Sequence, residues 1–201
     1  VRLRFAVPSA RRLVSACSLG VAAFVGELSN AITTLVFNFI LLRLSGNTAV
    51  AAYGVVANVA LVGTALFDGV SLGLQPIASA AHGQLNLPAA ARIRRSAVTI
   101  ALCIAAAPVA VTVVFARQIA GAFNSEGSAE LAACAIDGMR LYFPGFILAA
   151  VNIVNSGFYS AIGNGRASSV IALSRGVLAI SVMAFLLSEL LGVAGVWLAF
   201  P

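Results

Sequence analysis

The sequence has 201 residues, of which 61% are hydrophobic and 9% are charged, whereas about 25% of the residues in an average soluble domain are charged. A soluble fold of this size would have to bury several long uncharged segments, which the surface-to-volume ratio of so small a domain excludes. The formal net charge is +6. All of the basic residues are arginines near the ends of apolar segments rather than on one patch, so no nucleic-acid partner is expected.

Five apolar segments are long enough to cross a bilayer core, which takes about 20 residues of helix. The whole chain is therefore predicted to be one all-α domain, a polytopic transmembrane helix bundle of about five spans, with a sixth helix starting at Val193. Tight turns are predicted at 45–48 and 163–166, and polar connectors at 82–95 and 117–130. The predicted spans cover residues 13–42, 50–80, 96–116, 131–162 and 167–191.

The arginines mark one side of this predicted arrangement. When the N-terminus is placed in the cytoplasm and the spans alternate in direction, most arginines fall on the inner side, as the positive-inside rule requires. This predicts a multi-pass protein of the cell membrane with a cytoplasmic N-terminus. The inner arginines are Arg2, Arg4, Arg11, Arg12, Arg92, Arg94, Arg95 and Arg166, and the outer ones are Arg43, Arg117 and Arg140. Arg175 lies early in the fifth span, where its side chain is expected to reach the inner interface or a carbonyl group.

Two carboxylates lie near the middle of predicted spans, Glu27 in the first and Asp68 in the second. An acidic side chain at the centre of a membrane helix costs about 2.5–3.5 kcal/mol on insertion scales and usually faces a cavity or a partner. Neither carboxylate has an arginine at helical spacing, so each is expected to be protonated, to bind a cation or to face water. This chemistry is typical of a cation-exchange site, and no metal is expected beyond Na⁺ at Glu27.

Polar residues at helical spacing extend from these carboxylates. Glu27 begins a stripe on the first span, Asp68 begins another on the second, and Asn152 begins a third on the fourth span. We expect the three stripes to line one polar cavity. The alternative is that these side chains only form hydrogen bonds between packed helices. The predicted cavity-lining residues are Asn30, Thr34, Asn38, Ser71, Gln75, Asn152, Asn155 and Tyr159.

Three common enzyme and metal-site motifs are missing from the sequence: the GxxxxGK[ST] phosphate loop, HExxH and CxxC. Cys17, Cys103 and Cys134 are isolated, without the spacing of a metal or redox site. We therefore expect neither an enzyme nor a cofactor. The chain begins without methionine and ends inside an apolar run, so we expect it to be a piece of a longer protein.

Several short motifs follow one another along the chain in a fixed order. The first are AAYGV at 51–55, GVSLGLQPI at 69–77 and HGQ at 82–84. The later ones are AIGNGR at 161–166, SR at 174–175 and GVAGVWLA at 192–199. In this order and spacing, over nearly the whole chain, the sequence resembles the multidrug and toxic compound extrusion (MATE) transporters.

The resemblance implies twelve helices in two six-helix lobes, which rock to expose a central cavity alternately to each side of the membrane. This chain would be the second lobe without its last helix, and the N-terminal lobe of the same transporter would be its partner. Family cation sites often include a carboxylate on the first helix of this lobe, where Glu27 stands. One branch also uses an acid in the fourth helix, but residues 149–155 read AAVNIVN, so Asp68 is our hypothesis for a substitute.

The expected function is that of a secondary active antiporter, which exports amphipathic organic cations or drugs in exchange for H⁺ or Na⁺. Glu27 would bind the coupling ion, and the lipid bilayer and a small-molecule substrate are the further expected partners. One alternative is a flippase for a lipid-linked oligosaccharide of the same superfamily, which would present arginine to a phosphate. The central charges are mainly negative, which disfavours this alternative. Another is a fragment or scaffold that transports nothing.

Overall fold

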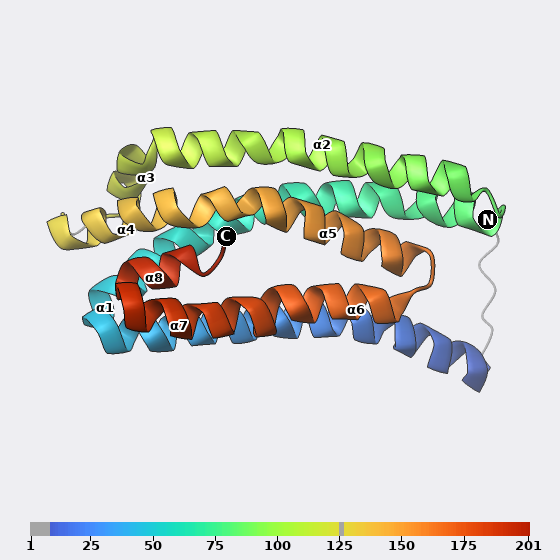
Figure 1. The fold of residues 1–201 in the computed structure, drawn as a ribbon, viewed down its shortest axis with the longest axis horizontal. Helices are drawn as coiled ribbons and strands as arrows, with labels where there is room; N and C mark the ends of the chain where they lie inside the picture. The colour runs from blue at the N-terminus through green and yellow to red at the C-terminus, as the bar shows by residue number, and fades with distance from the viewer. Residues whose placement is uncertain (1–8, 125–126) are drawn as a thin grey trace.

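The computed structural model describes residues 9–124 and 127–201 as a bundle of long, nearly parallel and antiparallel helices (Figure 1). Every regular element among the described residues is a helix, which confirms the predicted all-α class. Four described stretches are long and apolar enough to span a membrane. Large apolar side chains such as Val14, Val114 and Leu186 are exposed on the bundle surface, as expected for a surface that contacts lipid.

The first element, α1 (Ala10–Gly83), is a helical hairpin. The helical geometry breaks at Ser45 and Gly46, and Gly46 adopts φ 66° and ψ −154°, a conformation that side-chain-bearing residues rarely adopt. Figure 1 shows the N-terminal half of α1 beside α6 and α7, and the C-terminal half beside α5. The break falls in the predicted turn 45–48, so the two halves correspond to the first two predicted spans.

The second long helix, α2 (Leu87–Val114), begins earlier than the predicted third span. The side-chain oxygen of Asn86 accepts a hydrogen bond from the Ala89 N–H at 3.1 Å, and Pro88 fits the first helical turn. The end of the predicted connector 82–95 is therefore helical. A short helix, α3 (Ala116–Phe123), also forms within the other predicted connector.

The remaining predicted spans are each built from several elements joined end to end. The fourth span comprises α4 (Ala129–Tyr142), the 3₁₀ turn η1 (Phe143–Gly145) and α5 (Phe146–Ala161). The fifth comprises α6 (Gly165–Leu173), the π-helical η2 (Ser174–Ile180) and α7 (Ser181–Leu191). After a turn at Gly192, α8 (Val193–Leu198) occupies the start of the predicted sixth helix.

Aromatic side chains fill the core where α1, α4, α5 and α8 meet. Trp197 of α8 is 1% exposed, and its ring centroid lies 6.1 Å from that of Tyr53 on α1. Phe67 of α1 and Phe146 of α5 also pack together, with their ring centroids 5.7 Å apart. These contacts join elements that are distant in sequence, so the described residues form one packed bundle.

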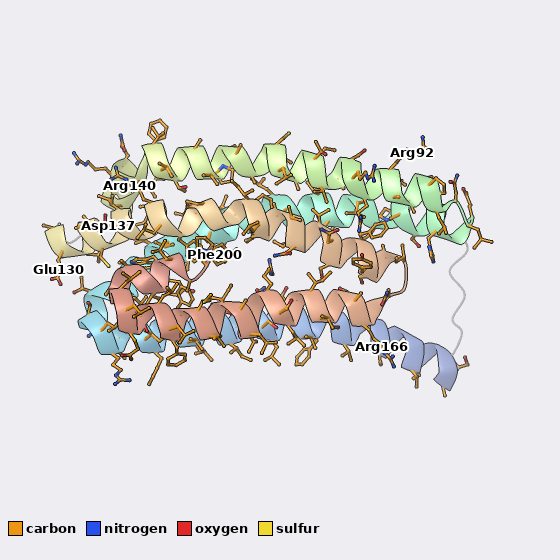
Figure 2. The ribbon with its side chains drawn as sticks, viewed as in Figure 1. Arg92, Glu130, Asp137, Arg140, Arg166 and Phe200 are labelled. Atoms are coloured by element: carbon orange, nitrogen blue, oxygen red, sulfur yellow. The ribbon has the colours of Figure 1, made fainter. Side chains whose placement is uncertain are left out.

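Charged side chains gather at the two ends of the bundle. Figure 2 shows Arg92 and Arg166 at one end, and Glu130, Asp137 and Arg140 at the opposite end. The helices alternate between the same two ends, as predicted for a multi-pass membrane bundle. Arg2, Arg4 and Glu126 lie outside the described residues, as do the side chains of Arg11 and Arg12.

Candidate functional site

A cavity of about 1010 Å³ lies between the two halves of α1, α5, and the rod formed by α6 and η2. Its volume is at the upper end of the range for small-molecule sites in proteins, roughly 300–1,000 Å³. Tyr142 and Phe200 also line it, and their rings stack with centroids 3.9 Å apart. The wall thus combines apolar and aromatic surface with the polar stripes of the long helices.

The structure brings both predicted stripes of α1 into this cavity. The N-terminal half contributes Glu27, and the C-terminal half contributes Asp68, both with exposed side chains. The other predicted residues of α1 that line the cavity are Asn30, Thr34, Asn38, Ser71 and Gln75. Asn152 of α5 also lines the cavity, so residues from three helical segments share one space.

The charged residues of the cavity lie at a similar depth in the bundle. At 1.5 Å of rise per residue, Glu27 lies about 27 Å along the helix from Ser45, and Asp68 lies about 33 Å from Gly46. Arg175 lies about 26 Å from the turn at Gly192, which Figure 1 places at the same end of the bundle as the break in α1. Glu27 and Asp68 are therefore close to mid-length of helical halves that are about 55 Å long, and Arg175 lies at a similar depth on a rod about 40 Å long.

Two predicted cavity residues lie elsewhere. The side-chain amide of Asn155 donates a hydrogen bond to the Val151 carbonyl of its own helix at 2.8 Å. The hydroxyl of Tyr159 accepts a hydrogen bond from Arg94 of α2 at 3.4 Å. Neither residue is among those that line the cavity. The spacing used for the third predicted stripe leads to the side of α5 that faces α2. The predicted roles of Asn155 and Tyr159 as cavity-lining residues are therefore corrected.

The cavity face of α5 instead follows Asn152 at intervals of four residues, through Ser156 and Ser160. Thr64, four residues before Asp68, extends its stripe in the N-terminal direction, and helical spacing from Asp68 would have found it. Asn58 of the same half of α1 also lines the cavity. Arg175 was expected to reach the interface or a carbonyl group, but it lines the cavity. No spacing signal pointed to it, because it is a single arginine in an otherwise apolar segment.

The hydrogen bonds bear on the alternative that the polar stripes only hold helices together. Several hydroxyl and amide groups in the stripes donate within their own helix, as Thr34 does to the Asn30 carbonyl at 3.0 Å. A side-chain bond between helices joins Ser156 and Ser168 at 2.9 Å. Among the described residues, Glu27 and Asp68 take part in no side-chain hydrogen bond or ion pair within 4.0 Å. Their carboxylates are therefore open to the cavity.

Within the part of the chain that the structure describes, no group of three or more His, Cys, Asp and Glu side chains is placed to hold a metal ion. The acidic residues of the cavity are carried by opposite halves of α1. The cavity wall also carries hydroxyl and amide groups, whose oxygen atoms are of the kind that small hard cations prefer as ligands.

A polytopic helical bundle with a large polar cavity and mid-depth carboxylates is the architecture of a membrane transporter lobe. The family model MatE matches residues 22–185, and the chain belongs to this family. It is therefore a multi-pass membrane protein of the MATE transporters, as the motif resemblance predicted.

Known relatives are about twice as long as this chain. It is 24% identical over 200 residues to the multidrug export protein MepA of Staphylococcus aureus, covering 98% of this chain and 42% of the relative. A solved structure of a multidrug resistance MATE family transporter of the MOP superfamily, in an outward-facing conformation, matches with a TM-score of 0.92 and 24% identity. That match covers 100% of this chain and 45% of the other.

Another solved structure is that of a MOP superfamily transporter from Pyrococcus furiosus, for which a reverse polarity of the binding pocket suggests a different function. It matches with a TM-score of 0.90 and 22% identity, over 96% of this chain and 44% of the other. At these identities the structural matches show the shared fold. The chain thus spans somewhat less than half of the length of the proteins that it matches.

Proposed function

We propose that this chain forms one lobe of a secondary active antiporter, which exports amphipathic organic cations in exchange for H⁺ or Na⁺. The observation that carries this proposal is the pair of carboxylates, Glu27 and Asp68, open to one large cavity at mid-depth of an apolar bundle. Unpaired acids are expensive at this depth, so they indicate an ion or substrate pathway. Membership of the MatE family and the similarity to a multidrug export protein support the same conclusion.

In the proposed mechanism, Glu27 exchanges the coupling ion for the substrate. A bound proton or Na⁺ neutralises the carboxylate and stabilises one orientation of the cavity, and release of the ion restores a negative charge that attracts the cationic substrate. The hydroxyl of Thr34 donates to the Asn30 carbonyl, so its own oxygen can still accept a hydrogen bond or contact a cation. Asp68 lines the same cavity from the other half of α1, and its carboxylate would hold a second cation in addition to the one at Glu27.

The second wall of the cavity would come from the N-terminal lobe of the same transporter, with exchange driven by rocking of the two lobes. In this proposal the end of the bundle that carries Arg92 and Arg166 faces the cytoplasm (Figure 2). The transporter would reside in the cell membrane, with the N-terminus of this segment inside.

The deciding experiment compares Glu27→Gln with the native transporter that contains this lobe, reconstituted in liposomes with an imposed pH or Na⁺ gradient. Glu189→Gln is the matched control, because it removes an exposed carboxylate that does not line the cavity. We expect Glu27→Gln to lower gradient-driven transport of a cationic dye at least tenfold, and Glu189→Gln to leave it unchanged. Equal transport by all three proteins would remove Glu27 from the mechanism. Comparing the two gradients in the native protein identifies the coupling ion.

One observation favours a second candidate function. Arg175 lines the cavity, as a flippase for a phosphate-bearing lipid would require. The same cavity also holds two carboxylates, which would repel a phosphate, so the antiporter remains our proposal. Translocation of a fluorescent phospholipid by the reconstituted protein, without transport of cationic dyes, would favour the flippase instead.

A further inference from the structure

Arg175 lies in an unusual part of the fifth rod. It is the second residue of η2, a π-helical segment between two α-helices. Such segments interrupt the regular ladder of hydrogen bonds and frequently occur at functional sites. The side chain is half-buried and lines the cavity together with Glu27 and Asp68, so this rod presents the cavity's one positive charge among the residues that line it.

The backbone next to Arg175 is held against α1 by a close contact. A Cβ atom added to Gly176 would lie 2.8 Å from the Cβ of Ser29, which is itself 2% exposed. Only glycine allows η2 to approach α1 this closely. Ser29 lies two residues from Glu27 on the same helix, so the base of the Arg175 side chain is fixed relative to the helix that carries Glu27.

The guanidinium group of Arg175 has no partner among the described residues. A guanidinium has five N–H donors, yet no described acceptor makes a hydrogen bond with it and no described carboxylate oxygen lies within 4.0 Å. Glu27 and Asp68 line the same cavity without reaching it. A charged group at this depth is costly unless something pairs with it. The N–H donors of Arg175 are therefore available to an anion that enters the cavity.

Arg175 also lies where the main cavity meets a smaller one. A second cavity, of about 320 Å³, shares Asn152, Arg175, Ile180 and Phe200 with the first. Its other walls are mainly apolar and come from α5, α7, the end of α8 and the segment after it, including Leu148, Met183, Leu187 and Leu198. A ligand at this junction would meet a guanidinium and an amide at its polar group and an apolar chamber beyond it.

We propose that Arg175 is an anion subsite for the carboxylate of a zwitterionic, amphipathic substrate. The cationic group of that substrate faces Glu27 and Asp68, and its apolar part enters the smaller cavity. This inference rests on the proposed export function and narrows its substrate class from cations to zwitterions. A carboxylate suits the site better than a phosphate monoester, because a single guanidinium faces two carboxylates in the same cavity and a dianion would be repelled.

The test uses a matched pair of dyes: a rhodamine ester, which is a monocation, and the corresponding free acid, which is a zwitterion. Transport of both is measured for the native transporter, Arg175→Gln and Arg175→Lys. Arg166→Gln is the control, because Arg166 lies on the same rod but does not line either cavity. We expect Arg175→Gln to raise KM for the acid relative to the ester about tenfold, the loss typical of a charge-assisted hydrogen bond. Arg175→Lys should recover part of the preference, because lysine keeps the charge without the planar fork.

Parallel changes for both dyes in Arg175→Gln would overturn the proposal, because they would mean that Arg175 acts on Glu27, Asp68 or the packing instead of the substrate. If that variant is not monodisperse, equilibrium binding to the native protein decides: the acid must bind more tightly than the ester, and equal affinities overturn the subsite. Binding that favours the acid without gradient-driven transport would retain the subsite and refute the export function. Failure to bind either dye overturns both.

Discussion

The closest approach of α5 to α1 offers a sharp test of how the cavity is built. A Cβ atom added to Gly157 on α5 would collide with the hydroxyl oxygen of Ser71 on α1. Ser71 is 6% exposed, and the side-chain nitrogen of Gln75 would lie 3.6 Å from the same atom, so the Ser71 side chain or α5 itself has to shift. We therefore expect Gly157→Ala to push α5 away from the C-terminal half of α1.

The magnitude follows from comparison with a second glycine. Gly73→Ala makes the same change in the interior of α1, where nothing lies within 4 Å of the added atom. Both substitutions gain up to about 1 kcal/mol of helix propensity, which cancels in the comparison. The remaining difference is the overpacking cost at Gly157, typically about 1–3 kcal/mol. At about 2–4 °C per kcal/mol for a chain of this size, Gly157→Ala should melt several degrees below Gly73→Ala.

The assay is thermal unfolding of the purified transporter in one detergent, followed by tryptophan fluorescence and by loss of the monodisperse peak. Adding Ser71→Ala to Gly157→Ala removes the colliding oxygen and leaves the Ser71 Cβ at 3.2 Å, a tight distance that a small shift relieves. The double variant should therefore regain most of the lost stability, with a coupling free energy of about 1 kcal/mol or more. Equal melting temperatures for the two glycine variants, or no recovery in the double variant, would refute the packing argument.

Two further substitutions test the backbone and the helix contacts. Gly46→Ala forces a side chain into φ 66° and ψ −154°, and should lower the unfolding free energy by about 1–3 kcal/mol, whereas Gly20→Ala, which meets no neighbour, should not lower it. Ser168→Ala removes the partner of Ser156 at 2.9 Å and should cost about 0.6 kcal/mol, the average for a bond between membrane helices. Both are measured by the same thermal assay, and a Gly46→Ala protein as stable as Gly20→Ala would contradict the first expectation.

The helices themselves were predictable because membrane burial requires long apolar runs, and turns interrupt such runs visibly in the sequence. The break at Ser45 and Gly46 and the start of α6 after Gly163 both lie in predicted turns. The short helix α3 was missed because Arg117 and Gln118 make this stretch look like a polar connector. Its length of two turns also gives too few residues for a periodic pattern to emerge.

The cavity face of α1 was predictable, whereas that of α5 was not. Each half of α1 has one polar stripe that contains a carboxylate, and an acid in an apolar helix must face a cavity or a partner. On α5, polar residues occur on two sides: Ser156 bonds to α6, and Tyr159 bonds to α2. Helical spacing alone does not say which of two polar faces is the cavity face.

Arg175 escaped prediction for a different reason. Spacing arguments assume 3.6 residues per turn, but η2 is π-helical, with wider turns, so the face on which a residue lies shifts across Ser174–Ile180. An arginine near the start of a span is also typical of a side chain that extends to the membrane–water interface. The packing of Gly176 on Ser29 shows that this part of the rod lies against the half of α1 that carries Glu27.

The glycine contacts at positions 176 and 157 divide the cavity wall into two close-packed pairs of helical segments. Gly176 ties η2 to the N-terminal half of α1, so Arg175 and Glu27 are carried by one pair. Gly157 ties α5 to the C-terminal half of α1, so the other pair carries Asp68. A movement that preserves both glycine contacts keeps Glu27 and Arg175 together while it changes their distance to Asp68. Gly157→Ala loosens only the second pair, so its effect on transport should resemble that of a defect at Asp68. The preference for the acid dye over the ester dye, which Arg175 sets, should not change.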